Sequence, residues 1–282
     1  MATAKDYRTD AEVVWCAGCG DFGVMAALAK AFARLEIPNE EIALISGIGC
    51  SSRLPGYFEV FGFNTLHDRA LPVAQGVKIA RPELTVVVAT GDGDALAIGA
   101  GHFLHAARRN TDMTVLLFDN QVYGLTKGQA SPTTPLGDKM KLASYGVQEE
   151  PIEPLSLAIQ CGATFAARGF SGDPKGLQKL IVEAIRHRGF SLVQVLSPCV
   201  TFRGKWDPFQ TIRDALSAIP DDHDPSDRLA AIGLSSAREH IYMGVAYRSE
   251  RPTYGDLMDR VTELAKPESA PPIHQVLEDF IE

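Results

Sequence analysis

Residues 85–94 read Thr85-Val-Val-Val-Ala-Thr-Gly-Asp-Gly-Asp94, an apolar run that ends in alternating glycines and aspartates. Such a run is typical of a short strand that is buried in a parallel sheet. The glycines let the backbone approach a phosphate closely, and the helix expected from Ala95 onward would offer it unpaired N–H groups. Taken alone, Gly-Asp-Gly is more typical of an ordinary strand-to-helix turn in which Asp94 caps the helix.

The alternation of strand and helix continues through the first 200 residues. Short apolar runs of strand length occupy residues 42–46, 85–89, 114–118, 164–167 and 191–196. Helical patterns occupy residues 21–35, 70–80, 95–109, 154–161 and 174–188. This order predicts an α/β fold with a doubly wound parallel sheet, whose ligands bind beyond the carboxyl ends of the strands. Gly49-Cys50, Gly91-Asp-Gly93 and Asn120 each follow a strand, so we expect them on one rim of the sheet.

Two further segments complete the expected organisation. Residues 121–150 carry Gly, Pro, Thr and Lys without a clear period and begin beside Asn120, so we expect an active-site loop. Beyond Pro198 the alternation fails, and residues 221–227 are acidic and turn-like. We therefore divide the chain into an α/β domain, residues 1–200, and a C-terminal extension, residues 201–282, that packs on the core or on a partner.

The overall composition excludes several classes of protein. The net charge is −8 and the basic residues form no cluster, which argues against nucleic acid as a partner. No apolar run is long enough to span a membrane, and the N-terminus lacks the apolar segment of a signal peptide. An odd number of cysteines, 5, is typical of a reducing compartment and of thiolate ligands rather than disulfides. We expect a cytoplasmic protein.

The aspartate of the Gly-Asp-Gly turn suits a divalent cation. Magnesium prefers oxygen ligands in octahedral geometry and usually shares them with a phosphate. Asp92 can supply a carboxylate, Asn120 a carboxamide oxygen and Val122 a backbone carbonyl. Because Asn120 ends the next strand, the combination favours a magnesium and diphosphate site over a plain turn.

A second set of residues consists of cysteines. Cys16-Ala-Gly-Cys19 forms a Cys-x-x-Cys pair, Cys50 follows the first strand and Cys199 follows the last. Such a pair can bind an iron–sulfur cluster or a tetrahedral zinc ion, or it can act as a redox dithiol. The position of Cys50 and Cys199 on the rim with the phosphate motif favours an electron-accepting cluster. Cys161, in an expected helix, is interpreted as a small core residue.

Gly-Asp-Gly followed by an Asn after 26 residues resembles the thiamine diphosphate fingerprint of transketolases, decarboxylases and 2-oxoacid oxidoreductases. That fingerprint usually ends in Asn-Asn, whereas this chain has Asp119-Asn120, which keeps only the metal-binding position. The resemblance implies the diphosphate-binding type of α/β domain.

The joint motif set is similar to the β-subunits of the 2-oxoacid:ferredoxin oxidoreductases. The matching segments cover most of the chain and include Trp15–Gly23, Gly47–Ser52, Thr65–Pro72, Gly91–Asp94, His102–Asn110, Asn120–Thr134, Ser197–Cys199 and Tyr247–Tyr254. One departure is Ala17, where the family usually has Pro. It leaves the thiols untouched, so we expect only a local change in the stiffness of the loop.

This resemblance implies two sets of metal ligands and a coenzyme site. Cys16, Cys19, Cys50 and Cys199 would bind a 4Fe-4S cluster, while Asp92, Asn120 and the Val122 carbonyl would bind Mg²⁺. The residues expected around thiamine diphosphate are Ile48, Gly49, Cys50, Ser51, His67, Gly91, Asp92, Gly93, Asp94, Asn120, Val122, Tyr123, Gly124, Leu125 and Thr126.

The implied activity is oxidative decarboxylation of a 2-oxoacid, with electrons passed through the cluster to ferredoxin and the acyl group passed to coenzyme A. A strong reductant could drive the reverse carboxylation. Arg53 and Lys127 could bind substrate carboxylates, which makes the dicarboxylate 2-oxoglutarate the preferred substrate, and His67 could contact the reacting groups. A partner α-subunit would supply the glutamate that activates thiamine, and two αβ pairs would form a closed heterotetramer.

Three alternatives remain open from the sequence. The enzyme could use pyruvate or a broad range of 2-oxoacids. It could also be a non-redox thiamine decarboxylase or synthase whose cysteines hold structural zinc. A third interpretation, a non-catalytic scaffold or electron-relay subunit, is disfavoured because Asp92 and Asn120 are both intact.

Overall fold

The computed structural model describes residues 2–203, 208–237, 239–265, 271–278 and 281. The predicted extension, residues 201–282, lies partly outside these ranges, at 204–207, 238, 266–270, 279–280 and 282. Among the described residues, no helix combines the length and the apolar character needed to cross a lipid bilayer.

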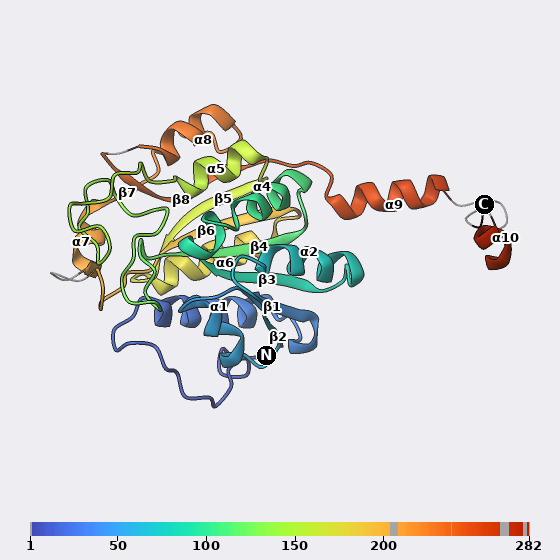
Figure 1. Ribbon diagram of the computed structural model, residues 1–282, viewed down its shortest axis with the longest axis horizontal. Helices are drawn as coiled ribbons and strands as arrows, with labels where there is room; N and C mark the ends of the chain where they lie inside the picture. The colour runs from blue at the N-terminus through green and yellow to red at the C-terminus, as the bar shows by residue number, and fades with distance from the viewer. Residues whose placement is uncertain (1, 204–207, 238, 266–270, 279–280, 282) are drawn as a thin grey trace.

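An eight-stranded sheet forms the centre of the molecule, with the order β2-β1-β3-β4-β6-β5-β8-β7 (Figure 1). The first six strands run parallel to one another. They are β1 (Ile42–Ser46), β2 (Phe61–Asn64), β3 (Thr85–Gly91), β4 (Met113–Asp119), β5 (Phe165–Phe170) and β6 (Phe190–Leu196). The predicted parallel α/β sheet is therefore confirmed, and every strand expected from the sequence is present.

Helices cover both faces of the sheet, as a doubly wound fold requires (Figure 1). Helices α1 (Asp21–Leu35) and α6 (Pro174–Arg186) pack on one face. Helices α2 (Ala70–Ala80), α4 (Ala100–Arg109) and α5 (Pro154–Cys161) pack on the other. Alternate residues of the inner strands enter the two cores, so each of these strands is apolar on both sides.

One predicted helix, over residues 95–109, is wrong as a single element. The structure has the short helix α3 (Asp92–Leu96) and then α4, with an irregular backbone at Ala97. Gly99 packs against the preceding turn so closely that a β-carbon there would lie 2.6 Å from the Asp94 carbonyl oxygen. The chain must bend at this point, and the helical periodicity of the sequence does not reveal the bend.

The predicted extension adds strands to the same sheet. β8 (Ile241–Arg248) pairs antiparallel with β5, and β7 (Leu216–Ala218) pairs with β8. Helices α7 (Pro208–Ala215) and α8 (Arg228–Ser235) accompany them, followed by α9 (Tyr254–Ala265) and α10 (Ile273–Glu278). α9 leads away from the sheet (Figure 1). Its base is fixed, because the Arg251 guanidinium donates to the carbonyls of Ala107, Arg108 and Gly162 at 2.9, 3.1 and 2.7 Å.

The glycine at position 23 is required by the packing of α1. A β-carbon on Gly23 would lie 2.1 Å from the backbone oxygen of Ser171, in the loop after β5. We expect Gly23→Ala to lower the free energy of unfolding by about 2 kcal/mol, because overpacking at a backbone contact forces the elements apart. Urea unfolding of the purified protein measures this change.

Gly76, inside α2, is the matched control because a β-carbon there would meet nothing within 4 Å. Gly76→Ala should raise the free energy of unfolding by up to about 1 kcal/mol, since alanine favours the helix more than glycine does. Equal effects of the two substitutions would contradict the packing argument.

Candidate active site

The expected motifs meet in one cleft at the carboxyl ends of β1, β3 and β4. The residues that line this cleft are Ile48, Gly49, Cys50, Ser51, His67, Gly91, Asp92, Gly93, Asp94, Phe118, Asn120, Val122, Tyr123, Gly124, Leu125 and Thr126. Every residue predicted to surround thiamine diphosphate is in this set. Phe118, at the end of β4, lines the cleft as well and was not predicted.

Asp94 fixes the loops around the cleft. Its Oδ1 accepts hydrogen bonds from the backbone N–H groups of Ile48, at 3.2 Å, and Asp68, at 2.8 Å. Its Oδ2 accepts a 2.7 Å hydrogen bond from Thr90. The imidazole Nδ1 of His67 lies 3.0 Å from Asp94 Oδ1. Asp94 therefore binds the surrounding loops and does not simply cap a helix, which was the ordinary interpretation of this turn.

Tyr123 stands against the glycine turn. Its hydroxyl donates to the Gly93 carbonyl at 3.1 Å, and a β-carbon on Gly93 would lie 2.3 Å from the tyrosine ring. Burial and the nearby aspartates raise the pKa of Tyr123 to about 12, so the phenol remains a hydrogen-bond donor at neutral pH. Glycine at position 93 is therefore needed for contact with this ring, in addition to any role with a phosphate.

Asp92 lies at the bottom of the cleft and is only 2% exposed. Its Oδ2 accepts hydrogen bonds from the hydroxyls of Ser131 and, at 2.6 Å, Thr133. The same Thr133 hydroxyl lies 2.9 Å from Asp119 Oδ1. Burial, and then the charge of Asp119, raises the pKa of Asp92 to about 7. Two carboxylates thus share one hydroxyl proton in a buried site.

The rest of this buried polar network was not predicted from the sequence. Gln194, on β6, donates to Asp119 Oδ2 at 2.7 Å, and its amide oxygen accepts a 2.9 Å hydrogen bond from Arg168 on β5. Arg168 is 4% exposed and also donates to the Ser235 carbonyl at 3.1 Å. A buried polar residue inside an apolar strand, such as Gln194, was the available signal. The network joins the bottom of the cleft to the C-terminal extension.

Asn120 turns its carboxamide back toward its own loop. Its Oδ1 accepts a 3.1 Å hydrogen bond from the backbone N–H of Val122. The chain then forms a tight hairpin, in which the N–H of Tyr123 donates to the Gln129 carbonyl at 2.9 Å. Lys127 lies in this hairpin with a φ of 76°, a conformation that side chains rarely adopt. The predicted active-site loop is therefore folded against the cleft.

Four thiols gather at one side of the cleft. A β-carbon on Gly124 would lie 3.7 Å from the Sγ atoms of both Cys50 and Cys199. Burial raises the pKa of Cys50 to about 11, with further contributions from Asp21, Cys199 and Cys16. Burial also raises the pKa of Cys19, to which Asp21, Cys50 and Cys199 add. Each of the four cysteines therefore lies within electrostatic reach of others in the group.

Backbone and side-chain contacts hold the thiol loops together. The Trp15 indole donates to the Cys50 carbonyl at 2.8 Å, and the Gly20 N–H donates to the Pro198 carbonyl at 3.2 Å. Asp21 lies beside this group, is 2% exposed and accepts a 2.7 Å hydrogen bond from Ser197. Burial raises the pKa of Asp21 to about 6. Cys161 is separate from these thiols and packs partly against the core under α5.

Arg53 and Lys127 are not among the residues that line the cleft. Arg53 is exposed in the 3-10 helix Ser51–Tyr57. Its charge is close enough to the Cys50 thiol to oppose part of the rise in the pKa of Cys50. Lys127 is exposed and lines a neighbouring cleft with Lys139 and Lys141. The structure therefore leaves their predicted role with substrate to be tested.

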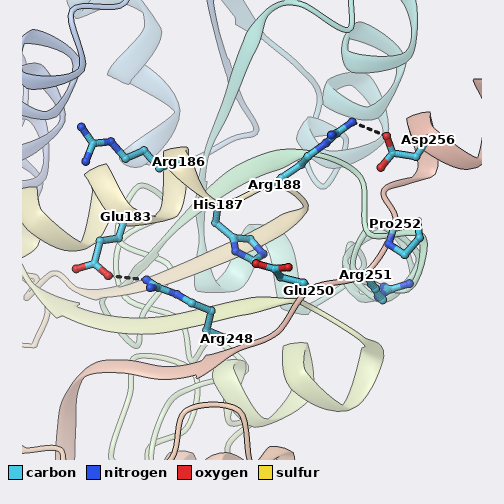
Figure 2. Close-up of a pocket in the computed structure, with 9 residues that line it drawn as sticks. All are labelled: Glu183, Arg186, His187, Arg188, Arg248, Glu250, Arg251, Pro252 and Asp256. Carbon is cyan, nitrogen blue, oxygen red and sulfur yellow. Dashed lines mark hydrogen bonds and ion pairs between the residues drawn. The ribbon is translucent and has the colours of Figure 1, made fainter.

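A larger cavity, of about 740 Å³, lies at the opposite rim (Figure 2). Its charged side chains mostly neutralise one another, with ion pairs between Arg248 and Glu183 and between Arg188 and Asp256. It lies at the amino ends of β5 and β6, far along the strands from the motifs. We therefore assign the candidate site to the smaller cleft.

Comparisons with known proteins agree with this geometry. Residues 47–195 match the family described as thiamine pyrophosphate enzyme, C-terminal TPP binding domain. Residues 199–263 match the family that is described as the C-terminal part of the pyruvate ferredoxin oxidoreductase beta subunit.

Individual relatives match over nearly the whole chain. The 2-oxoacid:ferredoxin oxidoreductase 2, subunit beta, of Aeropyrum pernix is 41% identical over 268 residues, which cover 91% of this chain and 87% of that protein. The 2-oxoglutarate synthase subunit KorB of Methanocaldococcus jannaschii is 37% identical over 255 residues, 90% and 94% of the two chains. A solved structure of a 2-oxoglutarate:ferredoxin oxidoreductase from Magnetococcus marinus, with 2-oxoglutarate, coenzyme A and succinyl-CoA bound, superposes with a TM-score of 0.94. The two sequences are 40% identical, and the match covers 98% of this chain and 95% of that chain.

The raised pKa of Asp92 predicts how stability depends on pH when no cation is bound. Between the ordinary value of 3.8 and about 7, the folded protein keeps a proton that the unfolded chain loses. The free energy of unfolding should therefore fall as pH rises through this window, by up to about 1.4 kcal/mol for each pH unit. Asp92→Asn removes the ionisation, so its stability relative to the wild type should be clearly greater at pH 8 than at pH 5.

Urea unfolding of the chelator-treated protein at the two pH values measures this difference. Asp173→Asn is the matched control, because this residue accepts a hydrogen bond from the N–H of Gly176 at an exposed helix start. A wild type whose stability does not decline between pH 5 and pH 8 would contradict the assignment of a costly buried carboxylate.

Proposed function

Because the chain belongs to the 2-oxoacid:ferredoxin oxidoreductase β-subunits, we propose that it carries the coenzyme and the electron-transfer centre of an enzyme that decarboxylates 2-oxoglutarate. The balanced reaction converts the 2-oxoacid anion and coenzyme A into the acyl thioester, CO₂, one proton and two electrons. The electrons reduce two molecules of ferredoxin, and a strong reductant reverses the reaction. The main support for this proposal is the position of Gly124, which lines the cleft and lies against two of the four thiols, those of Cys50 and Cys199.

The polar residues in the cleft fit thiamine diphosphate and Mg²⁺. Asp92, Asn120 and the Val122 carbonyl offer the hard oxygen ligands that Mg²⁺ prefers. Asp92 and Asp119 bury two carboxylates side by side, and a divalent cation would offset the cost of their repulsion. When bound, thiamine diphosphate would supply the carbanion that adds to the keto carbon of the substrate. Its thiazolium ring would also accept the electron pair that decarboxylation leaves on the substrate.

The thiol group fits a 4Fe-4S cluster better than a single zinc ion. Tetrahedral zinc with four thiolates brings the sulfur atoms to within about 3.8 Å of one another. Within the described residues, which include all five cysteines, no three thiols lie mutually within 4.8 Å. A cluster with an iron at each corner holds its thiolates farther apart. This spacing disfavours the alternative of a non-redox decarboxylase with structural zinc.

Arg53 and Lys127 are proposed to bind substrate carboxylates from loops that flank the cleft, and His67 to contact the reacting groups. Two cations suit a dicarboxylate, and the names of the Methanocaldococcus and Magnetococcus relatives carry 2-oxoglutarate. The Aeropyrum relative is named for 2-oxoacids in general. Pyruvate or a broad range of 2-oxoacids is therefore the second candidate.

The chain requires an α-subunit under this proposal, because one α/β domain supplies the diphosphate half of a thiamine site. The α-subunit would provide the activating glutamate, and two αβ pairs would form the enzyme. We place it in the cytoplasm, where its five unpaired cysteines would remain reduced. The test is anaerobic co-purification of both subunits, followed by viologen and ferredoxin reduction with a panel of 2-oxoacids and coenzyme A. A complex that reduces neither acceptor with any of them would exclude the proposal.

The thiol assignment predicts distinct results for two cysteine substitutions. Cys19→Ser should abolish the visible thiolate-to-iron absorbance and most of the iron, about four atoms per chain in the wild type, while thiamine diphosphate still binds. Cys161→Ser, outside the thiol group, should keep both. Metal analysis of the anaerobically purified complexes measures this, and zinc in place of iron would contradict the cluster.

The substrate assignment predicts a change in specificity when Lys127 is removed. In Lys127→Ala, kcat/KM for 2-oxoglutarate relative to pyruvate should fall about tenfold, because the distal carboxylate loses its charge partner. Viologen serves as the electron acceptor, so that only the substrate step is compared. Lys179→Ala, on α6, is the control and should leave the ratio unchanged; an equal loss toward both substrates in Lys127→Ala would exclude this role.

A further inference from the structure

Three lysines surround a cleft beside the thiol group. We name it the lysine cleft; its residues are Lys127, Gly128, Lys139, Met140, Lys141, Thr201 and Phe202, and it encloses about 480 Å³. All three lysines are exposed, and none forms an ion pair with any residue that the structure describes. No acidic side chain belongs to the described lining. The chain as a whole has a net charge of −8, so these lysines form a local positive surface on an acidic protein.

Backbone contacts give the lysine cleft a fixed shape. The N–H of Lys141 donates to the Gly128 carbonyl at 3.2 Å, which joins the two sides of the cleft. A β-carbon on Gly128 would lie 3.2 Å from the ring of Phe202, so the ring sits directly against this backbone. Phe202 is 38% exposed and offers an apolar contact between the lysines.

The charged residues next to the lysine cleft pair with each other, so the three lysines set the charge of this surface. Arg203 donates to Asp138 at 2.5 Å and to the Gln121 side chain at 2.9 Å, so this cation and this anion form a pair. The adjoining residues Leu142 and Tyr145 are 78% and 98% exposed. The surface therefore combines positive charge with exposed apolar groups, as protein interfaces do.

The lysine cleft is also close to a cluster ligand. Met140 belongs to a small apolar core with Val122 and Val147, against which Cys199 packs. Lys139, Phe202 and Cys199 line one further cleft together. The lysine cleft and Cys199 therefore share Met140, Lys139 and Phe202 as neighbours.

From these observations we infer that the lysine cleft is the docking surface for an acidic one-electron carrier protein. The inference rests on the proposed function, which requires such a carrier to reach the cluster twice in each turnover. A positive surface on an acidic chain would orient an acidic partner, because the rest of the molecule repels it. The short path through Cys199 would place the partner's redox centre close to the electron donor.

The test compares two charge-reversal variants of the αβ complex. Lys139→Glu/Lys141→Glu alters the lysine cleft without touching a residue assigned to substrate or coenzyme. Lys179→Glu/Arg186→Glu, on α6, makes the same change in net charge, and Arg186 lines the cavity at the opposite rim (Figure 2). Both pairs of side chains are exposed, so neither double substitution disturbs a core.

The lysine-cleft variant should lose tenfold or more in kcat/KM for ferredoxin, by the usual size of electrostatic steering. It should retain the wild-type rate with methyl viologen, a small cation that needs no acidic docking surface. The affinity of oxidised ferredoxin, measured by calorimetry at low salt, should fall by a similar factor. Raising the ionic strength should weaken ferredoxin binding to the wild type more than to this variant.

The control variant decides between a local and a general effect of charge. If it weakens ferredoxin binding as much as the lysine-cleft variant does, or if neither variant weakens it, the docking surface is wrong. If the wild-type complex reduces no acceptor with any 2-oxoacid, the proposed function fails, and calorimetry still tests the surface. Lys139→Gln/Lys141→Gln should give an intermediate loss; an effect as large as charge reversal would point to lost shape and would contradict electrostatic docking.

Discussion

The parallel pairing of β1, β3, β4 and β6 is the constraint on which the site depends. Because these strands run in one direction, their carboxyl ends lie along one rim, and the loop after each strand must meet the loops after its neighbours. Asp119 pairs with Leu196 at the ends of β4 and β6, so the Asn120 turn and the segment that leads to Cys199 begin side by side. The residues of the cleft and the thiols, which lie far apart in the sequence, are thereby brought into contact.

Within that frame, the site is held by buried polar groups that an ordinary core would exclude. Asp92 and Asp119 share the hydroxyl of Thr133, while Gln194 and Arg168 continue the network through the sheet. Burying like charges is costly unless other groups offset them. Arg168 compensates the charge of Asp119 through Gln194, whereas Asp92 has no basic partner in this network. The network therefore leaves an uncompensated buried carboxylate, Asp92, at the cleft.

The strands, the rim and the candidate cleft could be predicted from the sequence because they depend on local patterns. An apolar run such as residues 85–89 is buried on both faces and looks the same in any parallel sheet. β8 and the bend at Gly99 could not be predicted in this way. β8 depends on pairing with the distant strand β5, and the bend depends on a single close contact of Gly99. Arg168 and Gln194 were missed for a similar reason, because a polar residue in a strand becomes informative only once its partner is known.

Gly124 lies between the two halves of the site, the cleft and the thiols. It lines the cleft, and a β-carbon at this position would make ordinary van der Waals contact, at 3.7 Å, with the Sγ atoms of Cys50 and Cys199. A side chain longer than that of alanine would therefore fill the space between the thiols and the cleft or displace the hairpin that begins at Tyr123. Under the proposed function, a displaced hairpin would slow electron transfer between the cleft and the thiol group by lengthening the distance between them. The small residue at position 124 therefore lets the cleft and the thiols of Cys50 and Cys199 lie close together.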